Sequence, residues 1–220
     1  MTGRAAPAVD YSLYLVTDRP LCRGRELLEV VQEAVAGGAT VVQLREKKCP
    51  TGEFVRLARS LKALLQGSGV PLIINDRLDV ALAAEADGLH LGQSDMAIGD
   101  ARGIAGSGLL IGVSAESVAD AVRAEREGAD YIGVSPVFAT ATKQDTAPPL
   151  GLAGVAAIRA AVRLPLVGIG GIAVENVAAV IAAGADGAAV VSAIVAADSP
   201  LAAAQALKQE IISAREGRQR

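Results

Sequence analysis

Cysteine, histidine and aromatic residues are scarce in this chain of 220 residues. Only Cys22 and Cys49 are present, and neither lies in a Cys-x-x-Cys motif, so we expect no disulfide framework and no zinc site. The one histidine, His90, has no histidine or cysteine near it in sequence. Three Tyr, two Phe and no Trp leave almost nothing for stacking nucleic-acid bases. These shortages favour a reducing, cytoplasmic setting.

Excess charge and long apolar runs are also missing. The 21 Lys and Arg against 24 Asp and Glu give a net charge of −3, which argues against nucleic acid as a partner. No run approaches the roughly 20 apolar residues that span a bilayer, and Met1–Asp10 lacks the apolar core of a signal peptide, so no membrane partner is expected. Hydrophobic residues, at 51%, suffice for a large core.

Short apolar runs alternate with longer helical patterns along the whole chain. The runs are rich in aliphatic residues and bounded by Gly, Pro or Asp, which is typical of strands buried on both faces of a parallel sheet. The predicted strands are Ser12–Thr17, Thr40–Leu44, Pro71–Ile74, Gly88–Leu91, Leu109–Val113, Tyr131–Val134, Leu166–Ile169 and Gly187–Val191.

Helical periodicity fills the segments between these strands. Thr51 is a candidate N-cap for the second helix, and two of the helices are short and weakly patterned. The predicted helices are Gly24–Ala36, Thr51–Leu65, Asp76–Ala84, Ile98–Ala105, Ser117–Glu127, Leu152–Ala161, Val174–Ala183 and Pro200–Ser213.

One short turn sequence recurs four times, each time just before a predicted strand. It reads Gly37-Gly-Ala-Thr, Glu85-Ala-Asp-Gly, Gly128-Ala-Asp-Tyr and Gly184-Ala-Asp-Gly. In three copies a glycine can end the preceding helix in a left-handed conformation. The repeat supports β/α units, although it is also common in open α/β sheets.

Eight strands alternating with helices predict a single-domain (β/α)8 TIM barrel over residues 1–220, with 1–10 and 216–220 as loose ends. A doubly wound open sheet is the rival architecture. Active sites of such barrels lie at the carboxyl ends of the strands. Polar side chains gather there, after six of the predicted strands: Asp18, Gln43 to Lys47, Asn75 to Arg77, His90 to Asp95, Ser114 to Glu116, and Thr140 to Lys143.

Asp76 and Asp95 follow adjacent strands and are the candidate ligands for Mg²⁺, which takes one or two carboxylates together with waters and phosphates. The alternative is that each aspartate caps the helix after it. Arg45, Lys47 and Lys143 would supply positive charge for a polyphosphate. Lys143 lies in a segment of about 16 residues, Ser135–Leu150, of the length that often forms a lid.

Glycines after the seventh strand, Gly168-Ile-Gly170-Gly171, and Ser192 after the eighth are typical of a phosphate site built from backbone N–H groups. The alternative is a tight turn. His90 is interpreted as a buried, structural histidine, and no serine or cysteine sits in a nucleophile motif.

Taken in order, these motifs resemble the thiamine phosphate synthase family over about four fifths of the chain. The resemblance rests on Tyr14-Leu-Val-Thr-Asp18, Gln43-Leu44-Arg45-Glu46-Lys47, Asn75-Asp76-Arg77, His90-Leu-Gly-Gln93-Ser-Asp95, Ser114, Thr140-Ala141-Thr142-Lys143, Gly168-Ile-Gly170-Gly171-Ile172 and Val191-Ser192. Two positions depart from the family pattern, which has Gly at Ser135 and Pro at Ala139.

The resemblance implies a Mg²⁺-dependent transferase that joins (4-amino-2-methyl-5-pyrimidinyl)methyl diphosphate to 4-methyl-5-(2-hydroxyethyl)thiazole phosphate and releases pyrophosphate. The diphosphate would leave first, without a side-chain nucleophile. Asp76 and Asp95 would bind Mg²⁺. Arg45, Lys47 and Lys143 would be catalytic. The pyrimidine diphosphate would contact Gln43 to Lys47, Leu44 and Glu46 included, with Asn75, Ser114 and Lys143, and the thiazole phosphate would contact Thr140, Ala141, Thr142, Gly171, Val191 and Ser192.

Other functions on the same barrel stay open. A thiazole tautomerase or regulatory relative would need an acid or base at the mouth and no diphosphate machinery. A non-catalytic binder of the same phosphates and a phosphosugar isomerase are further alternatives. The sequence is compatible with a homo-oligomer.

Overall fold

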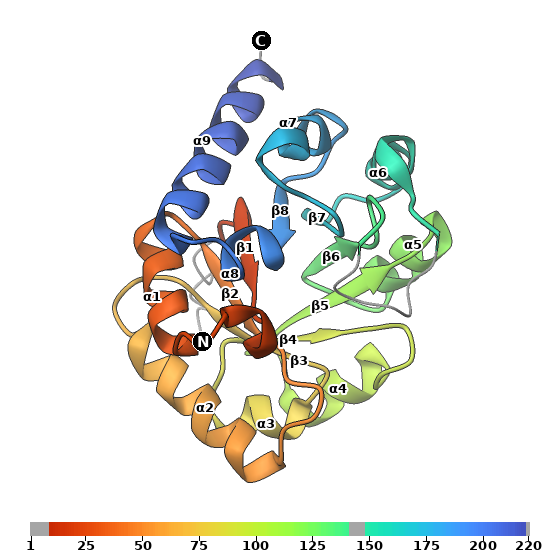
Figure 1. The fold of residues 1–220 in the computed structure, drawn as a ribbon. Coiled ribbons are helices and arrows are strands. Elements are labelled where there is room, and N and C mark those ends of the chain that lie inside the picture. The colour runs from red at the N-terminus through yellow and green to blue at the C-terminus, as the bar shows by residue number, and fades with distance from the viewer. Residues whose placement is uncertain (1–8, 141–147, 219–220) are drawn as a thin grey trace.

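Eight parallel strands pair in chain order, and β8 closes on β1 to complete a barrel (Figure 1). The computed structural model describes residues 9–140 and 148–218. Closure leaves no sheet edge, so the barrel prediction is confirmed and the open sheet is wrong. The strands are β1 Leu13–Val16, β2 Val41–Leu44, β3 Leu72–Asn75, β4 Gly88–Leu91, β5 Leu110–Ala115, β6 Tyr131–Val134, β7 Leu166–Ile169 and β8 Gly187–Val190.

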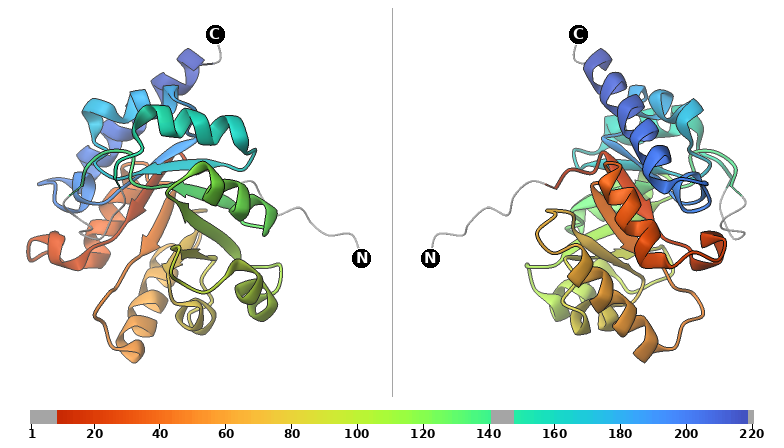
Figure 2. Two further views of the ribbon diagram at one scale, coloured as in Figure 1. Left: turned by 90° about the vertical axis from the view of Figure 1, so that its right-hand side faces the viewer. Right: turned by 60° about the vertical axis from the view of Figure 1, so that its left-hand side comes forward.

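Helices surround the barrel on its outside. The last one, α9, packs between α1 and α7 and so closes the outer ring across the point where β8 meets β1 (Figures 1 and 2). The helices are η1 (3-10) Arg19–Cys22, α1 Leu27–Ala36, α2 Thr51–Leu64, α3 Leu78–Ala83, α4 Ile98–Ala105, α5 Val118–Arg126, α6 Gly151–Ala161, α7 Val174–Ala182, α8 Ser192–Val195 and α9 Pro200–Arg218.

Alternation along each strand divides the apolar core in two. One set of side chains, with Leu13, Leu15 and Val42 among them, packs between the strands and the helices. A smaller set, with Tyr14 and Tyr131 among them, packs inside the barrel. The inner set fills the barrel interior, and its side chains form the floor beneath the polar residues at the carboxyl ends of the strands.

The recurring turn ends four helices in the same backbone conformation. Gly38, Gly128 and Gly184 have φ of 108°, 89° and 115°, as predicted for left-handed caps, and Glu85 takes φ 52° in the copy without glycine. The residue two positions later then binds the neighbouring strand.

These residues hold the start of each odd-numbered strand. Asp87, Asp130 and Asp186 each accept a hydrogen bond through Oδ2 from a backbone N–H at the start of β3, β5 or β7, at 2.7–2.9 Å. Thr40 Oγ1 does the same for β1, at 3.1 Å from Leu13 N. The repeat therefore fastens the amino end of the barrel at four equivalent places.

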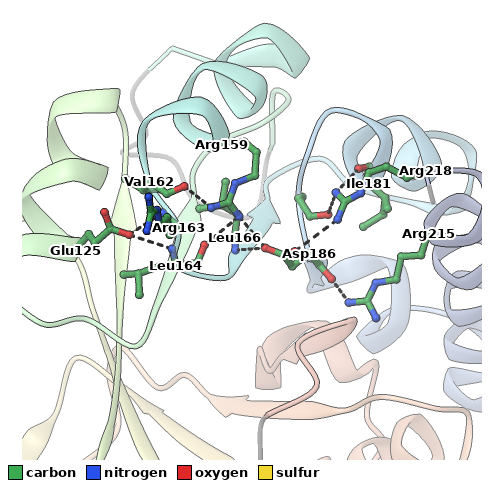
Figure 3. Close-up of polar contacts among 11 residues, drawn as sticks. Glu125, Arg159, Val162, Arg163, Leu164, Leu166, Ile181, Asp186, Arg215 and Arg218 are labelled. Carbon is green, nitrogen blue, oxygen red and sulfur yellow. Dashed lines mark hydrogen bonds and ion pairs between the residues drawn. The ribbon is translucent and has the colours of Figure 1, made fainter. Parts of the chain in front are cut away.

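A cation from an outer helix completes the arrangement at each of the four places. Lys62 of α2 and Arg159 of α6 lie 2.6 and 3.1 Å from the carboxylates of Asp87 and Asp186. Arg102 of α4 pairs with Asp130, and Lys208 of α9 pairs with Asp10 beside Thr40. Figure 3 shows one of the four sites, where Arg159 and Arg218 approach the Asp186 carboxylate from two sides.

Three local predictions differ from the structure. Thr51 is the first residue of α2 rather than its N-cap, and its hydroxyl accepts from Arg77 instead. Helix α9 extends to Arg218, whose guanidinium donates to Ile181 O and Ala185 O, so 216–218 are not loose. Asp10 is also fixed, because its carboxylate accepts from Ser12 N at 2.9 Å. Residues 1–8 and 219–220 of the predicted ends lie outside the described residues.

Candidate active site

A cavity of about 850 Å³ opens at the carboxyl ends of the strands. It collects most of the residues that the sequence singles out, and these come from seven of the eight strands, β2 to β8, or from the loops that follow them. The predicted residues that line it are Gln43, Arg45, Lys47, Asn75, Asp76, Asp95, Ser114, Thr140, Gly171, Val191 and Ser192.

Some predicted contacts do not line this cavity. Leu44 is fully buried and packs outward against the helices, as its place beside Gln43 on β2 requires. The Glu46 carboxylate turns away to Arg19, whose Nε lies 2.8 Å from Oε1. Ala141, Thr142 and Lys143 lie outside the described residues.

Two carboxylates, of Asp76 and Asp95, lie together on one side of the cavity. Burial raises the pKa of Asp95, and the neighbouring Asp76 raises it further, partly offset by a hydrogen bond from Gly92 N and by the charge of Lys47. Lys47 Nζ lies 2.5 Å from Asp76 Oδ2. The pair is thus a concentration of negative charge that one lysine offsets only in part.

Neither aspartate caps a helix. Asp95 Oδ2 accepts from Gly92 N at 2.7 Å within its own loop, while α4 begins after Ala97 without a side-chain cap. Helix α3 likewise begins after Arg77 without one. Asp76 has φ 62°, a backbone conformation that residues other than Gly, Asn and Asp rarely adopt. The capping interpretation is therefore wrong for both residues.

The donor set suits a hard divalent cation that keeps other ligands. Among residues 9–140 and 148–218, no group of three or more His, Cys, Asp or Glu side chains could hold a metal by itself. Two oxygen ligands with room for water and phosphate are what Mg²⁺ takes at substrate sites, whereas a structural zinc would need four ligands. Asp76 and Asp95 fit Mg²⁺ on this ground.

Arg45 is held at the rim of the cavity. Its Nη1 lies 3.3 Å from Asp18 Oδ2, and its backbone N–H donates to Thr17 Oγ1 at 3.1 Å. The Arg45 side chain is about one-fifth exposed, so it can meet an anion in the cavity without leaving Asp18. Together with Lys47 it gives the carboxylate side of the cavity two cations.

A continuous chain of hydrogen bonds crosses the floor of the cavity. Gln43 Nε2 donates to the Tyr14 hydroxyl at 2.8 Å, and that hydroxyl lies 2.8 Å from the Tyr131 hydroxyl. Tyr131 Oη is 3.0 Å from His90 Nδ1, and His90 Nε2 is 3.0 Å from Ser114 Oγ. All five residues line the cavity, so both ends of this series of hydrogen bonds lie at the cavity wall.

Sequence reasoning named Gln43 and Ser114 as substrate contacts but missed the hydrogen bonds that connect them. His90 was predicted to be buried and structural; it bonds to Tyr131 and Ser114, but it is only partly buried and it lines the cavity. Tyr14 was named only as the first residue of a motif, and Tyr131 only as the first residue of a predicted strand; neither was given a role in the site. Strand alternation could have placed them inside the barrel, on the same face as Val16 and Gly133. Burial raises the pKa of both phenols, so each stays protonated and can donate.

The glycine-rich loop after β7 packs against the segment after β6. Gly170 and Gly171 have φ of 105° and 62°, and a Cβ on Gly171 would lie 2.5 Å from Ala139 O. Val137 N and Phe138 N donate to Ile169 O and Gly170 O. These glycines therefore permit a close approach of two loops, and a side chain at Gly171 would strike that segment rather than fill the cavity.

Residues at the start of α8 also line this side of the cavity. Ser192 and Ala193 begin α8, where the first N–H groups of a helix have no partner within it. Both residues line the cavity, as do Gly171 and Ile172. The arrangement suits a phosphate, because backbone N–H groups and a helix start both attract negative charge.

Within the described ranges, no helix is both long enough and apolar enough to cross a membrane.

The chain shares 54% identity with the thiamine-phosphate synthase of Chloroflexus aurantiacus over 92% of this chain and 94% of that one. It shares 52% with that of Methanoculleus marisnigri, over 94% and 99%.

A solved structure is also similar. The thiamine phosphate pyrophosphorylase from Pyrococcus furiosus superposes with a TM-score of 0.87 at 39% identity, over 94% of this chain and 98% of that one. A family model described as thiamine monophosphate synthase matches residues 13–194. That match confirms the resemblance read from the motifs: the chain belongs to the thiamine monophosphate synthase family.

Proposed function

We propose that this chain is a thiamine-phosphate synthase. It would join (4-amino-2-methyl-5-pyrimidinyl)methyl diphosphate to 4-methyl-5-(2-hydroxyethyl)thiazole phosphate, giving thiamine phosphate and pyrophosphate. One observation carries the proposal: a single cavity gathers a carboxylate pair with cations, a polar floor and a backbone-lined phosphate niche. Those three zones would hold the diphosphate, the pyrimidine ring and the thiazole phosphate, respectively. Identity above 50% with proteins named for this activity supports the same assignment.

The diphosphate would lie against Lys47 and Arg45, beside Asp76 and Asp95. These two aspartates would hold Mg²⁺, which when bound supplies positive charge to the diphosphate oxygens. Lys47 is already beside Asp76, so it would donate to the same oxygens from a fixed position. Lys143 would add a third cation, by the match of its motif to the family.

The thiazole phosphate would take the opposite side of the cavity. The N–H groups of Gly171, Ser192 and Ala193 would face its oxygens. Val191 and Ile169 line the wall nearby and suit the apolar face of the thiazole ring. Thr140 also lines the cavity and would meet the same substrate.

The bond change would be a substitution at the pyrimidine methylene carbon. Its C–O bond to the diphosphate breaks, and the electron pair leaves with the diphosphate. The amino-substituted ring carries the resulting positive charge. The lone pair of the thiazole nitrogen then forms the new C–N bond. No side-chain nucleophile takes part, so the chain's contribution is stabilisation of the departing diphosphate and exclusion of water.

A two-substrate assay with purified protein tests this proposal. We expect thiamine phosphate and pyrophosphate in equal amounts, and loss of both when Mg²⁺ is chelated. Rearrangement of the thiazole without condensation would instead indicate a tautomerase. Binding of both phosphates with no turnover would indicate a non-catalytic relative. Turnover that is indifferent to Mg²⁺ removal would overturn the role of the aspartates.

A further inference from the structure

The chain of hydrogen bonds on the cavity floor can run in two directions, and the direction decides what its ends offer a ligand. A hydroxyl donates one proton, and a neutral imidazole has one N–H and one acceptor nitrogen. The links between Gln43, Tyr14, Tyr131, His90 and Ser114 therefore reverse together or not at all.

The barrel is shaped to hold this chain in place. A Cβ on Gly112 would lie 2.0 Å from Tyr131 Cζ, and a Cβ on Gly133 would lie 3.1 Å from His90 Cε1. Glycine inside a strand weakens it, so two glycines at these points indicate space kept for the two rings. Tyr131 is fully buried, and Tyr11 stacks on it with ring centroids 4.7 Å apart.

The contact of Gln43 with Tyr14 selects one direction. Gln43 Nε2 donates to Tyr14 Oη, so the Tyr14 proton needs another acceptor. Among the described residues, the Tyr131 hydroxyl is the acceptor within reach, at 2.8 Å. Tyr131 then donates to His90 Nδ1, which places the imidazole proton on Nε2. His90 Nε2–H donates to Ser114 Oγ, and the Ser114 proton remains for the cavity.

We propose that His90, held as its Nε2–H tautomer, is a positioning residue that carries this direction from Tyr131 to Ser114 and thereby contributes to the specificity for the ring. Ser114 then offers a donor and Gln43 offers its carbonyl oxygen, Oε1, as an acceptor. An aminopyrimidine presents the complement, because its amino group donates and its ring nitrogens accept. The reversed chain would offer an amide NH₂ and a serine lone pair, which suit an oxopyrimidine with a protonated ring nitrogen.

The identity of the ring rests on the proposed function, but the polarity does not. His90 is the only histidine of the chain, so ¹⁵N-histidine labelling gives one imidazole signal set without assignment. Long-range ¹H–¹⁵N spectra of the free protein at pH 8 are expected to show a protonated Nε2 and an unprotonated Nδ1. A protonated Nδ1 would overturn the proposal, whether or not the protein makes thiamine phosphate.

Substitution of the central phenol tests the consequence for binding. Tyr131→Phe breaks the chain in the middle, while Tyr11→Phe removes a hydroxyl from the adjacent stacked ring outside it. Calorimetry compares (4-amino-2-methyl-5-pyrimidinyl)methyl diphosphate with its 4-oxo counterpart, with no thiazole present. Tyr131→Phe is expected to lower the preference for the amino compound by about tenfold or more, since one hydrogen bond is at stake at each end.

Tyr11→Phe is expected to keep both the preference and the Nε2–H tautomer. An unchanged preference in folded Tyr131→Phe would overturn the link between the chain and specificity. If Tyr131→Phe does not fold, the tautomer of the wild-type protein still decides the direction. A correct tautomer without synthase activity would refute the proposed function and leave the polarity standing.

Discussion

The two ends of the barrel use the same charged residue types in opposite ways. At the amino end, Asp87, Asp130 and Asp186 each meet a backbone N–H at the start of an odd-numbered strand and a cation from the helix that leads into that strand. At the carboxyl end, Asp76 and Asp95 lie beside each other, and burial together with that neighbouring charge raises the pKa of Asp95. Carboxylates are satisfied at one end and crowded at the other.

This difference separates stability from function along one axis. Satisfied charges at the amino end fix where the odd strands begin, and they need no ligand. The crowded carboxylates at the carboxyl end are offset only in part by Lys47, and under the proposed function they would gain further partners when substrate and Mg²⁺ bind. Stabilising contacts at the amino end therefore allow the carboxylates at the carboxyl end to remain crowded. Such functional sites are where structure is expected to depart from what sequence patterns predict.

The largest effects are expected from neutralising the crowded pair. Asp76→Asn and Asp95→Asn should each lower kcat/KM in the two-substrate assay by about 100- to 1,000-fold, the usual loss for one preorganised electrostatic group. Asparagine tolerates the φ of 62° at residue 76. Asp79→Asn, on the surface of α3 and paired with Arg77, is the control and should keep full activity.

The stability of Asp95→Asn sharpens the comparison. A raised carboxyl pKa means that the folded protein loses relative stability as the pH rises through the range between the ordinary pKa and the raised one. Neutralising Asp95 removes that loss, so the metal-free variant should melt no lower than the wild type at pH 7. A large fall in Tm would show that Asp95 serves the fold, against this assignment.

The next largest loss of activity is expected from substitution of Lys143, which would contact the departing diphosphate. Charge on those oxygens grows as the C–O bond breaks, so the contact strengthens in the transition state and is lost from kcat rather than KM. Lys143→Ala should cut kcat by about 30- to 1,000-fold, from about 2–4 kcal/mol. Single-turnover kinetics at saturating substrates check this, and an unchanged rate of pyrophosphate release would refute it.

How much the sequence predicts follows the same division. Strands β4, β6 and β7 have the predicted bounds to the residue, because buried aliphatic runs between Gly, Pro and Asp are a local signal. The carboxyl-end residues were predicted because several strand ends converge, and Asp76, Asp95 and Ser114 do line one cavity.

Other features depend on contacts between distant segments. Helix α8 has four residues and η1 has four, too few for periodicity to register. The extension of α9 to Arg218 relies on carbonyl groups of Ile181 and Ala185, far away in sequence. Gly171 was expected to make room for a phosphate, yet its Cβ position faces Ala139 O. Only the packed structure sets that direction.

At the amino end, removing a satisfied carboxylate should affect stability alone. Asp186→Ala leaves Leu166 N–H without its acceptor and takes the carboxylate from Arg159 and Arg218. Arg159 keeps the carbonyl oxygen of Leu164 as an acceptor. Leu166 is fully buried, whereas the ion pair is partly exposed and adds little. The expected loss is therefore mainly that of one buried donor left without an acceptor, about 1.5 kcal/mol, or about 3–6 °C in Tm for a chain of this size. Asp198→Ala, on a fully exposed side chain paired with Arg23, is the control. The kcat of Asp186→Ala at 25 °C should match the wild type, and a lower value would mean that the two ends are coupled.

The smallest effect is expected where the repeat uses a hydroxyl in place of a carboxylate. Thr40 Oγ1 both accepts from Leu13 N at 3.1 Å and donates to Leu13 O at 3.0 Å, and the charge of Lys208 is met separately by Asp10. Thr40→Val keeps the shape and removes both bonds, but leaves that ion pair intact. Its cost is therefore about 0.5–1 kcal/mol, a fall in Tm of about 1–4 °C, below that of Asp186→Ala. Paired thermal melts of the two variants measure the order. If Thr40→Val costs more than Asp186→Ala, the cations do not contribute to holding the odd strands, and the four sites act through backbone hydrogen bonds only.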